Sequence, residues 1–498
     1  MKTKQIYKSI AFSLSMFVFA SCGNDWLNTV PSDSVPADDA ITTYKAATVA
    51  LTGIYDGLQG SSSRVSYYGA RMFYYGDVRG DDMQARAQGM RSSTCYEMRY
   101  TADNAPDMWT IPYNVIRRAN RLLEAIEQNK IEDATEEQLE SMKAEALTIR
   151  ALVHFDLCRL YANPYTMDNG ASKGVPIVTT PLEMNALPSR NTVAEVYEQV
   201  LKDLSDALAT GGLSESKNYG YVNVWFAKGL QARVNLYKGA NSEALAIAED
   251  VIKNSPYELW TNEEYVDGWA TTDSGRKEML FELVNKSSDD WTDREGIAYL
   301  MHENGYADLI ATRSFLDLME QDPDDVRNGI LIPATMDKNL QSEYGDAKIF
   351  VNKFPADPAS GEMRLNSLPI MRLSEVYLIA AEAAAKTGNS AKAAEYLNKI
   401  VLRANPEATA VSESEATVER IMLERRKEFV GEGQRFFDAM RNNETIVRYT
   451  NDTDKGYHYS LIQESTKFDR TYFRCILPIP VDETNVNPNL KQEQNPGY

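Results

Sequence analysis

Two alanine-rich helix hairpins limit most strongly how this chain can fold. The segments LQARVNLYKGANSEALAIAEDVI, which starts at Leu230, and IAAEAAAKTGNSAKAAEYLNKIV, which starts at Ile379, align without a gap when Gly239 is placed on Gly388. Small apolar residues repeat at helical spacing on both sides of the glycine. Small side chains let two helices pack closely, and the glycine permits a tight turn between them. The alignment predicts two tetratricopeptide-like helix pairs, and two unrelated alanine-rich hairpins remain the alternative.

Helical periodicity extends over most of the chain. It predicts helices near 38–59, 107–128, 135–161, 192–209, 222–238, 242–254, 369–387, 390–403 and 414–440. Strand-like segments are few, such as KGVPIVTT from Lys173 and CILPIPV from Cys475. Residues 255–368 lie between the two hairpins and are richer in Gly, Asp and Trp, with weaker periodicity. We therefore predict a mainly α fold in which 255–368 forms an irregular lobe on a helical scaffold.

The N-terminus has the pattern of an exported lipoprotein. Three lysines within the first eight residues precede a short apolar run, Ile10–Ala20, which is too short to span a bilayer. Residues 1–21 are therefore predicted to be a signal peptide. A cysteine at the first mature position is what lipoprotein processing requires, so we interpret Cys22 as a lipid anchor and 22–37 as a tether. A cysteine that follows a plain secretory signal by chance is the alternative.

Charge and composition exclude several classes of function. The net charge of -20 argues against binding to nucleic acid and against docking on anionic lipid. Without Cys22, three cysteines remain, which argues against a disulfide framework but leaves a single bridge open. The three histidines are far apart in the sequence, which disfavours a zinc site or Ser-His-Asp catalysis. We predict no catalytic residues, no metal site and no cofactor.

Two acidic stretches resemble functional motifs only loosely. ERRKEFVGEGQRFFDAMRNN, residues Glu424–Asn443, combines acids and arginines that would suit either catalysis or a structural ion-pair network. We favour the network, because Phe429, Phe436 and Phe437 place core-type residues among the charges. EQDPDDVRNG, residues Glu320–Gly329, lacks the central glycine and distal glutamate of an EF-hand and is predicted to be a capped turn, with a bound calcium ion as the alternative.

Aromatic residues gather beside charged residues in two regions. One is YYGARMFYYGDVRGDDMQARAQGMR, which starts at Tyr67, and the other is the set of Trp and Tyr residues between Trp260 and Tyr306. Aromatic faces stack on the C–H faces of sugars, and charged groups bind sugar hydroxyls. Most individual rings are expected to fill the core. The rings in polar or glycine-rich context, Trp269, Trp291 and Tyr306, are the best candidates for a binding platform.

Several long motifs together resemble one known family. They are the N-terminal cysteine pattern, AEALTIRALVHFDLCRLYANPY from Ala144, LPIMRLSEVYLIAAEAAAKTG from Leu368, ERRKEFVGEGQRFFDAMR from Glu424 and LPIPVDETNVNPNLKQEQNPGY from Leu477. This combination resembles the SusD/RagB family of surface nutrient-binding lipoproteins over nearly the whole chain. The resemblance implies four tetratricopeptide-like helix pairs in residues 38–498 that support a variable ligand-binding lobe.

The resemblance also implies a function. It implies a lipid-anchored protein on the surface of the outer membrane that binds a glycan and passes it, without cleavage, to a TonB-dependent transporter of the SusC type. Ligand contacts in the family correspond here to the loops Asp81–Arg91 and Trp291–Tyr306. The predicted ligand-binding residues are Asp81, Asp82, Arg86, Arg91, Trp269, Trp291, Tyr299 and Tyr306.

Three other functions stay open at this point. Some members of the family bind peptides rather than glycans. An all-α glycoside hydrolase would also contain many paired acids, since the chain has 72 Asp and Glu residues. A tetratricopeptide scaffold that binds only protein is disfavoured by the long, tryptophan-containing middle region.

Overall fold

The computed structural model describes most of the chain after the predicted tether. The described residues are 40–60, 67–217, 220–270, 276–285, 295–335, 347–448, 458–459 and 461–498. Cys22, the predicted signal peptide and tether, and Trp291 lie outside the described residues. None of the helices within the described ranges is both long and apolar enough to cross a membrane.

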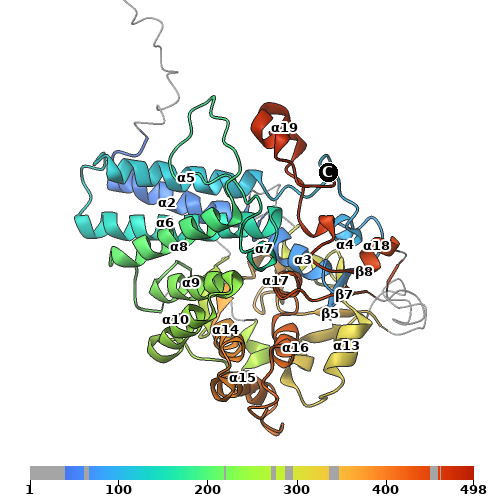
Figure 1. Ribbon diagram of the computed structural model, residues 1–498. Coiled ribbons are helices and arrows are strands. Elements are labelled where there is room, and N and C mark those ends of the chain that lie inside the picture. The colour runs from blue at the N-terminus through green and yellow to red at the C-terminus, as the bar shows by residue number, and fades with distance from the viewer. Residues whose placement is uncertain are drawn as a thin grey trace, which may run out of the picture.

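A row of long helices forms the scaffold, and each helix packs against the next in the row. In order, they are α2 (Tyr44–Gln59), α5 (Thr110–Glu127), α6 (Glu136–Tyr161), α8 (Val193–Ala209), α9 (Val224–Lys238), α10 (Asn241–Asn254), α14 (Leu373–Lys386) and α15 (Ser390–Ala404). Figure 1 shows α2, α5, α6 and α8 at one end of this row and α14 and α15 at the other. The predicted mainly α fold is confirmed.

Local sequence signals set the helix ends. Thr135 and Gln138 form a reciprocal capping box at the start of α6, and Thr192 and Glu195 form another at the start of α8. Each predicted hairpin turns at a glycine in the left-handed region, Gly239 with φ 83° and Gly388 with φ 78°.

The two alanine-rich hairpins lie side by side although more than a hundred residues separate them in sequence. Helix α10 of the first hairpin packs directly against α14 of the second. The alignment matches Ala244 with Ala393 and Ala232 with Ala381, and all four residues are fully buried. The intervening residues therefore leave the row of helices and return to it without interrupting the packing.

The remaining elements are short helices and two-stranded antiparallel sheets. The strand pairs are β1 (Met83–Ala85) with β3 (Leu309–Ala311), β2 (Met279–Leu283) with β6 (Leu368–Arg372), β4 (Leu331–Pro333) with β5 (Ile349–Val351), and β7 (Ile446–Val447) with β8 (Lys467–Phe468). The short helices are α3 (Arg71–Val78), α4 (Ser93–Glu97), α7 (Tyr165–Asp168), α11 (Tyr265–Gly268), α12 (Ile297–Leu300), α13 (Arg313–Met319), α16 (Val418–Phe429), α17 (Arg435–Arg441), α18 (Gln463–Thr466), α19 (Val481–Val486) and α20 (Pro488–Gln492), with 3-10 turns at Val326–Ile330, Met363–Leu365 and Phe473–Cys475.

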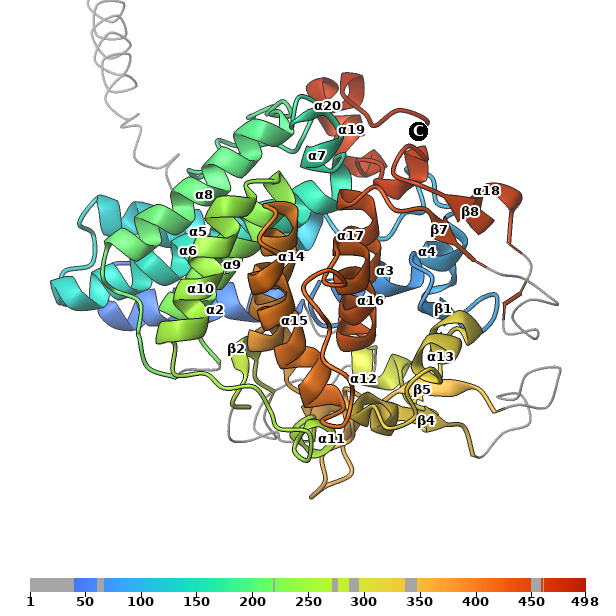
Figure 2. The ribbon, with the colours of Figure 1, turned by 60° about the horizontal axis from the view of Figure 1, so that its bottom comes forward.

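The lobe draws on more of the chain than the predicted segment 255–368. Strand β1 comes from the N-terminal part and pairs with β3, and β6 lies at the end of the segment and pairs with β2. Figure 2 shows β1, α13, β4 and β5 gathered on one side of α16, with α14 and α15 on the other. Helix α16 and its neighbour α17 therefore lie between scaffold and lobe.

Four predictions of secondary structure differ from the structure. KGVPIVTT from Lys173 and CILPIPV from Cys475 form no strand, and the first makes only one isolated bridge, between Lys173 and Thr192. The helix predicted over 369–387 begins at Leu373, because the preceding residues form β6. The helix predicted over 414–440 is broken into α16 and α17.

Two glycines cause that break. Gly431 and Gly433 have φ of +81° and +74°, which favours glycine. A side chain on Gly433 would place its Cβ 2.6 Å from the carbonyl oxygen of Met72, at the start of α3. The backbone NH of Gly433 donates to Asp77 Oδ2 of α3 at 2.9 Å. The glycines thus let the turn after α16 pack directly on α3.

The charged stretch Glu424–Asn443 belongs to a buried ion-pair network, as predicted. Glu428 accepts hydrogen bonds from Arg403 (2.6 Å), Arg372 (3.1 Å) and Arg327 (3.2 Å), three residues on separate elements. These four side chains are at most 4% exposed. The network joins α15, α16, β6 and the turn after Asp325, and so fastens the lobe to the helices.

The stretch Glu320–Gly329 contains a capped turn. The side chain of Asp325 accepts from the backbone NH of Arg327 at the start of the 3-10 turn Val326–Ile330 and also forms an ion pair with the Arg327 side chain.

Candidate functional site

Four side chains form an accessible cluster on the lobe, which we call the tyrosine cluster: Arg91, Glu295, Tyr299 and Tyr306. The guanidinium carbon of Arg91 lies 3.4 Å from the centre of the Tyr306 ring. Arg91 Nη2 donates to Glu295 Oε1 at 2.7 Å. The Tyr299 ring lies 6.0 Å from the Tyr306 ring, at an angle of 46°. Arg91 and Glu295 are 38% and 36% exposed, and the tyrosines are half-buried.

A tight turn after α12 positions the two tyrosines. The backbone NH of Tyr306 donates to the carbonyl oxygen of Tyr299 at 2.7 Å. A Cβ on Gly305 would lie only 2.3 Å from the same oxygen, so the turn requires glycine there. The residues between the tyrosines therefore hold the two rings at a fixed separation.

A buried carboxylate positions Arg91 beside this turn. Asp308 Oδ2 accepts from the backbone NH of Arg91 at 2.6 Å, and Oδ1 accepts from the NH and hydroxyl of Ser92. Burial raises the pKa of Asp308, and these hydrogen bonds oppose the rise. Asp308 thus joins the segment after β1 to the turn that carries Tyr306, across more than two hundred residues of sequence.

The electrostatics of the cluster centre on the exposed ion pair. Hydrogen bonding to Glu295 raises the pKa of the Arg91 guanidinium. The guanidinium of the pair lies over the face of Tyr306, where a cation is attracted to the ring. A ligand that reaches the cluster meets two phenols, a guanidinium and a carboxylate around aromatic surface.

Arg86 stands apart from the four cluster residues. Arg86 Nε donates to the carbonyl oxygen of Ala307 at 2.7 Å, so Arg86 supports the same turn from the side. Trp291 lies outside the described residues. Among the predicted ligand residues, Arg91, Tyr299 and Tyr306 are therefore the ones that the structure brings together.

The placement of Asp81 and Asp82 corrects their prediction as ligand-binding residues. Asp81 Oδ1 accepts from Arg435 Nε at 2.6 Å, and Asp82 Oδ1 accepts from Arg426 Nε at 2.9 Å. The Asp82 side chain is 1% exposed and that of Asp81 is 11% exposed. Both acids are committed to ion pairs that attach the loop after α3 to α16 and α17. Their arginine partners are about 350 residues away in the sequence, so a local pattern does not reveal the pairs.

The placement of Trp269 is a second correction. Its side chain is 2% exposed and packs edge-on against Trp260, with ring centres 5.2 Å apart. Arg372 and Lys353 each lie 5.0 Å from its ring centre. Trp269 is thus a core residue beside the buried ion-pair network and has no face available for a sugar.

In the described part of the chain, metal binding and thiol chemistry would depend on the His, Cys, Asp and Glu residues. No group of three or more His, Cys, Asp or Glu residues there is arranged to hold a metal ion. Cys95, Cys158 and Cys475 are free and buried, and burial raises the pKa of each thiol to about 12. At neutral pH these thiols are protonated and unreactive.

Sequence reasoning missed two residues of the site. Glu295 and Asp308 were not singled out, because each acquires its role only through a partner about two hundred residues away. The spacing of acids along the chain carries no signal for such pairs.

Comparisons with known proteins agree with this architecture. A family model described as the SusD family matches residues 191–498, and one described as "Starch-binding associating with outer membrane" matches residues 25–236. A solved putative sugar binding protein from Bacteroides vulgatus is 40% identical, with a TM-score of 0.83 over 92% of this chain and 99% of its own. A SusD superfamily protein from Bacteroides thetaiotaomicron is 38% identical, with a TM-score of 0.83 over 91% and 100%.

A more distant relative matches over a similar length. A SusD-like protein of Bacteroides ovatus is 22% identical over 91% of this chain and 86% of its own. The family match to more than half of the chain, together with the helical row and lobe described above, leads to one conclusion: this protein belongs to the SusD family.

Proposed function

We propose that this protein is a lipid-anchored receptor on the surface of the outer membrane that binds an oligosaccharide or polysaccharide at the tyrosine cluster. It then delivers the glycan to a TonB-dependent transporter of the SusC type, without cleaving it. The observation that carries the proposal is the exposed Arg91–Glu295 pair across the ring of Tyr306, beside Tyr299.

The geometry of the cluster indicates how a sugar would approach. Arg91 covers one face of Tyr306, so the sugar ring lies over the guanidinium and against Tyr299. The remaining donors of Arg91, the Glu295 carboxylate and the two phenols then bind sugar hydroxyls. Binding of this kind is polar at the rim and apolar at the ring faces.

Relatives support the glycan as the ligand class. The relative at 40% identity is described as a putative sugar binding protein. A laminarin-binding SusD-like protein and a surface glycan-binding protein in complex with laminarihexaose are 23% and 20% identical and share the fold. At that identity they support the scaffold, and laminarin enters here only as one member of a test panel.

The anchor and the partner complete the proposal. Cys22 carries the lipid, residues 1–21 are removed on export, and 22–37 link the lipid to the folded part. The family model's description, which names association with the outer membrane, supports this location.

The buried ion pairs of Glu424, Glu428 and Asp438 support a receptor rather than a hydrolase, because these acids hold the fold together.

Affinity electrophoresis of a form that lacks residues 1–22 tests the ligand class. The panel contains plant, host and microbial glycans, laminarin among them, and a set of peptides. We expect one glycan to retard the protein and the Tyr306→Ala variant to migrate freely. Binding to peptides alone would instead assign the cluster to a peptide-binding member of the family.

A further inference from the structure

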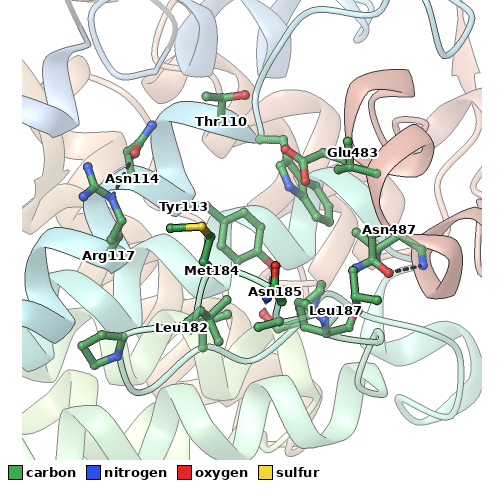
Figure 3. Close-up of a pocket in the computed structure, with 18 of the residues that line it drawn as sticks. Thr110, Tyr113, Asn114, Arg117, Leu182, Met184, Asn185, Leu187, Glu483 and Asn487 are labelled. Atoms are coloured by element: carbon green, nitrogen blue, oxygen red, sulfur yellow. Dashed lines mark hydrogen bonds between the residues drawn. The ribbon is translucent and has the colours of Figure 1, made fainter. Parts of the chain in front are cut away.

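A concave site of the structure is lined by none of the residues that the sequence analysis predicts to bind ligand. It is a cavity of about 660 Å³ between α5, the loop 176–188, and α19 and α20. Figure 3 shows Tyr113 of α5, Met184 and Leu187 of the loop and Glu483 of α19 around it. Its volume is in the range of sites that hold a few bulky side chains or a small ligand.

Hydrogen bonds at both ends fix the loop that walls this cavity. Near its start, Tyr113 Oη donates to the carbonyl oxygen of Pro176 at 2.9 Å, and Asn120 Nδ2 donates to that of Val178 at 3.0 Å. At its end, Asn487 Nδ2 donates to the carbonyl oxygen of Pro188 at 2.8 Å. The loop is therefore held in place by α5 at its start and by Asn487, between α19 and α20, at its end.

Apolar side chains at this cavity are exposed to an unusual degree. Within the described residues, nine large hydrophobic side chains are exposed, and four of them line this one cavity. They are Met184 (98% exposed), Val486 (73%), Leu182 (50%) and Leu187 (47%). Exposed apolar residues scattered singly are ordinary, but a group of them around a concave site marks a surface that another segment covers.

The chain itself supplies a segment of suitable chemistry. We call residues 23–39, which precede the described part, the leading segment. It contains the adjacent bulky apolar residues Trp26 and Leu27, and its charged residues are all acidic. The cavity carries Arg117 and Arg121 on the part of α5 that leads toward the start of α2. The apolar character of Trp26 and Leu27 therefore matches the apolar lining, and the two arginines of the cavity outnumber its one carboxylate, that of Glu483, which suits an acidic segment.

The leading segment is also long enough to reach the cavity. The backbone NH of Glu132, just beyond the end of α5, donates to the carbonyl oxygen of Thr42, so the described chain begins near that end of α5. Helix α5 has 18 residues, so it is about 27 Å long. The 13 steps from Leu27 to Ala40 span up to about 43 Å when extended. Every part of the cavity along α5 is within this reach.

We propose that Trp26 and Leu27 of the leading segment bind in the cavity between α5, the loop 176–188 and α19–α20. The consequence rests on the proposed anchor at Cys22. With Trp26 bound, only four steps separate the lipid-bearing residue from the folded body, which is about 13 Å of chain. The body is then held next to the membrane in a set orientation instead of at the end of a long tether.

Photo-crosslinking of the full chain tests the proposal. p-Benzoyl-phenylalanine replaces Trp26, the purified protein is irradiated at low concentration in detergent, and mass spectrometry locates the crosslinks. We expect crosslinks within one chain to residues 182–188 or 483–490, with Met184 as the preferred acceptor. The same photoreactive residue in place of Ser34 is the positional control and is expected to give few crosslinks to these residues.

A surface variant separates docking from chance contact. Leu182→Asp with Val486→Asp places carboxylates at the cavity while Met184 stays in place. It is expected to lower the crosslink yield about tenfold, because a charge resists transfer into an apolar site. Val49→Asp, at a residue of α2 that is 65% exposed and outside the cavity, is the matched control and is expected to leave the yield unchanged.

Three results would overturn the proposal: crosslinks between two copies, which would assign the cavity to a second copy; crosslinks to other surfaces; or a yield that the aspartates do not change. None of these readouts involves a glycan, so they are independent of the proposed ligand.

Discussion

The molecule places an arginine–carboxylate pair against an aromatic ring in two very different settings. In the core, Arg372 pairs with Glu428 and Glu432 and lies 5.0 Å from the ring of Trp269. On the lobe surface, Arg91 pairs with Glu295 and lies 3.4 Å from the ring of Tyr306. The core pair is at most 7% exposed, whereas the surface pair is more than a third exposed.

The difference in burial separates structure from binding. In the core, each charge has lost its water and depends entirely on its partners, so the loss of one partner leaves an uncompensated charge. At the surface, water still solvates both groups and the pair contributes little to stability. The same chemistry therefore fastens the lobe in one place and stays available to a ligand in the other.

The largest expected effect comes from breaking the core network. Glu428→Ala leaves Arg327, Arg372 and Arg403 without their shared carboxylate. We expect the free energy of unfolding to fall by about 3–5 kcal/mol, measured by urea denaturation. A change as small as the one expected below for Glu295→Gln would contradict the difference in stability assigned to the core and surface pairs.

Acid provides a second way to loosen the attachment of the lobe. Burial alone would raise the pKa of Asp81, but Arg435 and Arg426 outweigh it and lower the pKa from 3.8 to about 2. The pair with these arginines therefore stabilises the fold fully above about pH 4 and is lost as the pH falls toward 2. We expect this carboxylate to contribute about 2 kcal/mol.

Denaturation between pH 5 and 2 checks this expectation. Asp81→Asn should show a shallower loss of stability with acid than the wild type over that interval. Parallel curves for the two proteins would show that Asp81 is not paired in the folded state.

At the surface cluster, the expected effect is on affinity rather than stability. Arg91→Ala removes the guanidinium that lies over Tyr306, and we expect about tenfold weaker glycan binding. Lys202→Ala is the matched control, because it removes a paired, exposed cation of α8 far from the cluster in sequence. Isothermal titration calorimetry with the retarding glycan measures both, and equal losses would argue for non-specific attraction.

The smallest expected effect is that of Glu295→Gln on stability. The substitution keeps the shape of the side chain but removes one charge of an exposed pair. We expect the free energy of unfolding to change by less than about 0.5 kcal/mol. A much larger change in thermal denaturation would mean that the surface pair also fastens the fold.

How far the sequence could predict this molecule depends on how local each signal is. Helices α6 and α8 were predicted within one residue at each end, because Thr135 and Thr192 carry capping boxes. β6 was hidden in a helical pattern, since its residues are all buried and leave no alternation to detect. Local signals therefore predict the helices of the scaffold but not the strands of the lobe.

The candidate site depends on contacts that no local pattern records. Trp269 lies in a polar, glycine-containing context, which suggested an exposed ring, but distant residues such as Lys353 and Arg372 cover it. Arg91 and Tyr306 were both predicted, whereas their meeting through Asp308 depends on the pairing of β1 with β3. The residue types were therefore predictable and their separation into core and surface was not.

The most direct test of the account compares the two aromatic rings in one binding experiment. The wild type, Tyr306→Ala and Trp269→Phe, each without residues 1–22, are run in affinity gels that contain the retarding glycan. We expect Tyr306→Ala to lose retardation while it unfolds at a temperature close to that of the wild type. We expect Trp269→Phe to keep retardation but to unfold at a lower temperature. Retardation that survives in Tyr306→Ala and disappears in a folded Trp269→Phe would contradict these expectations.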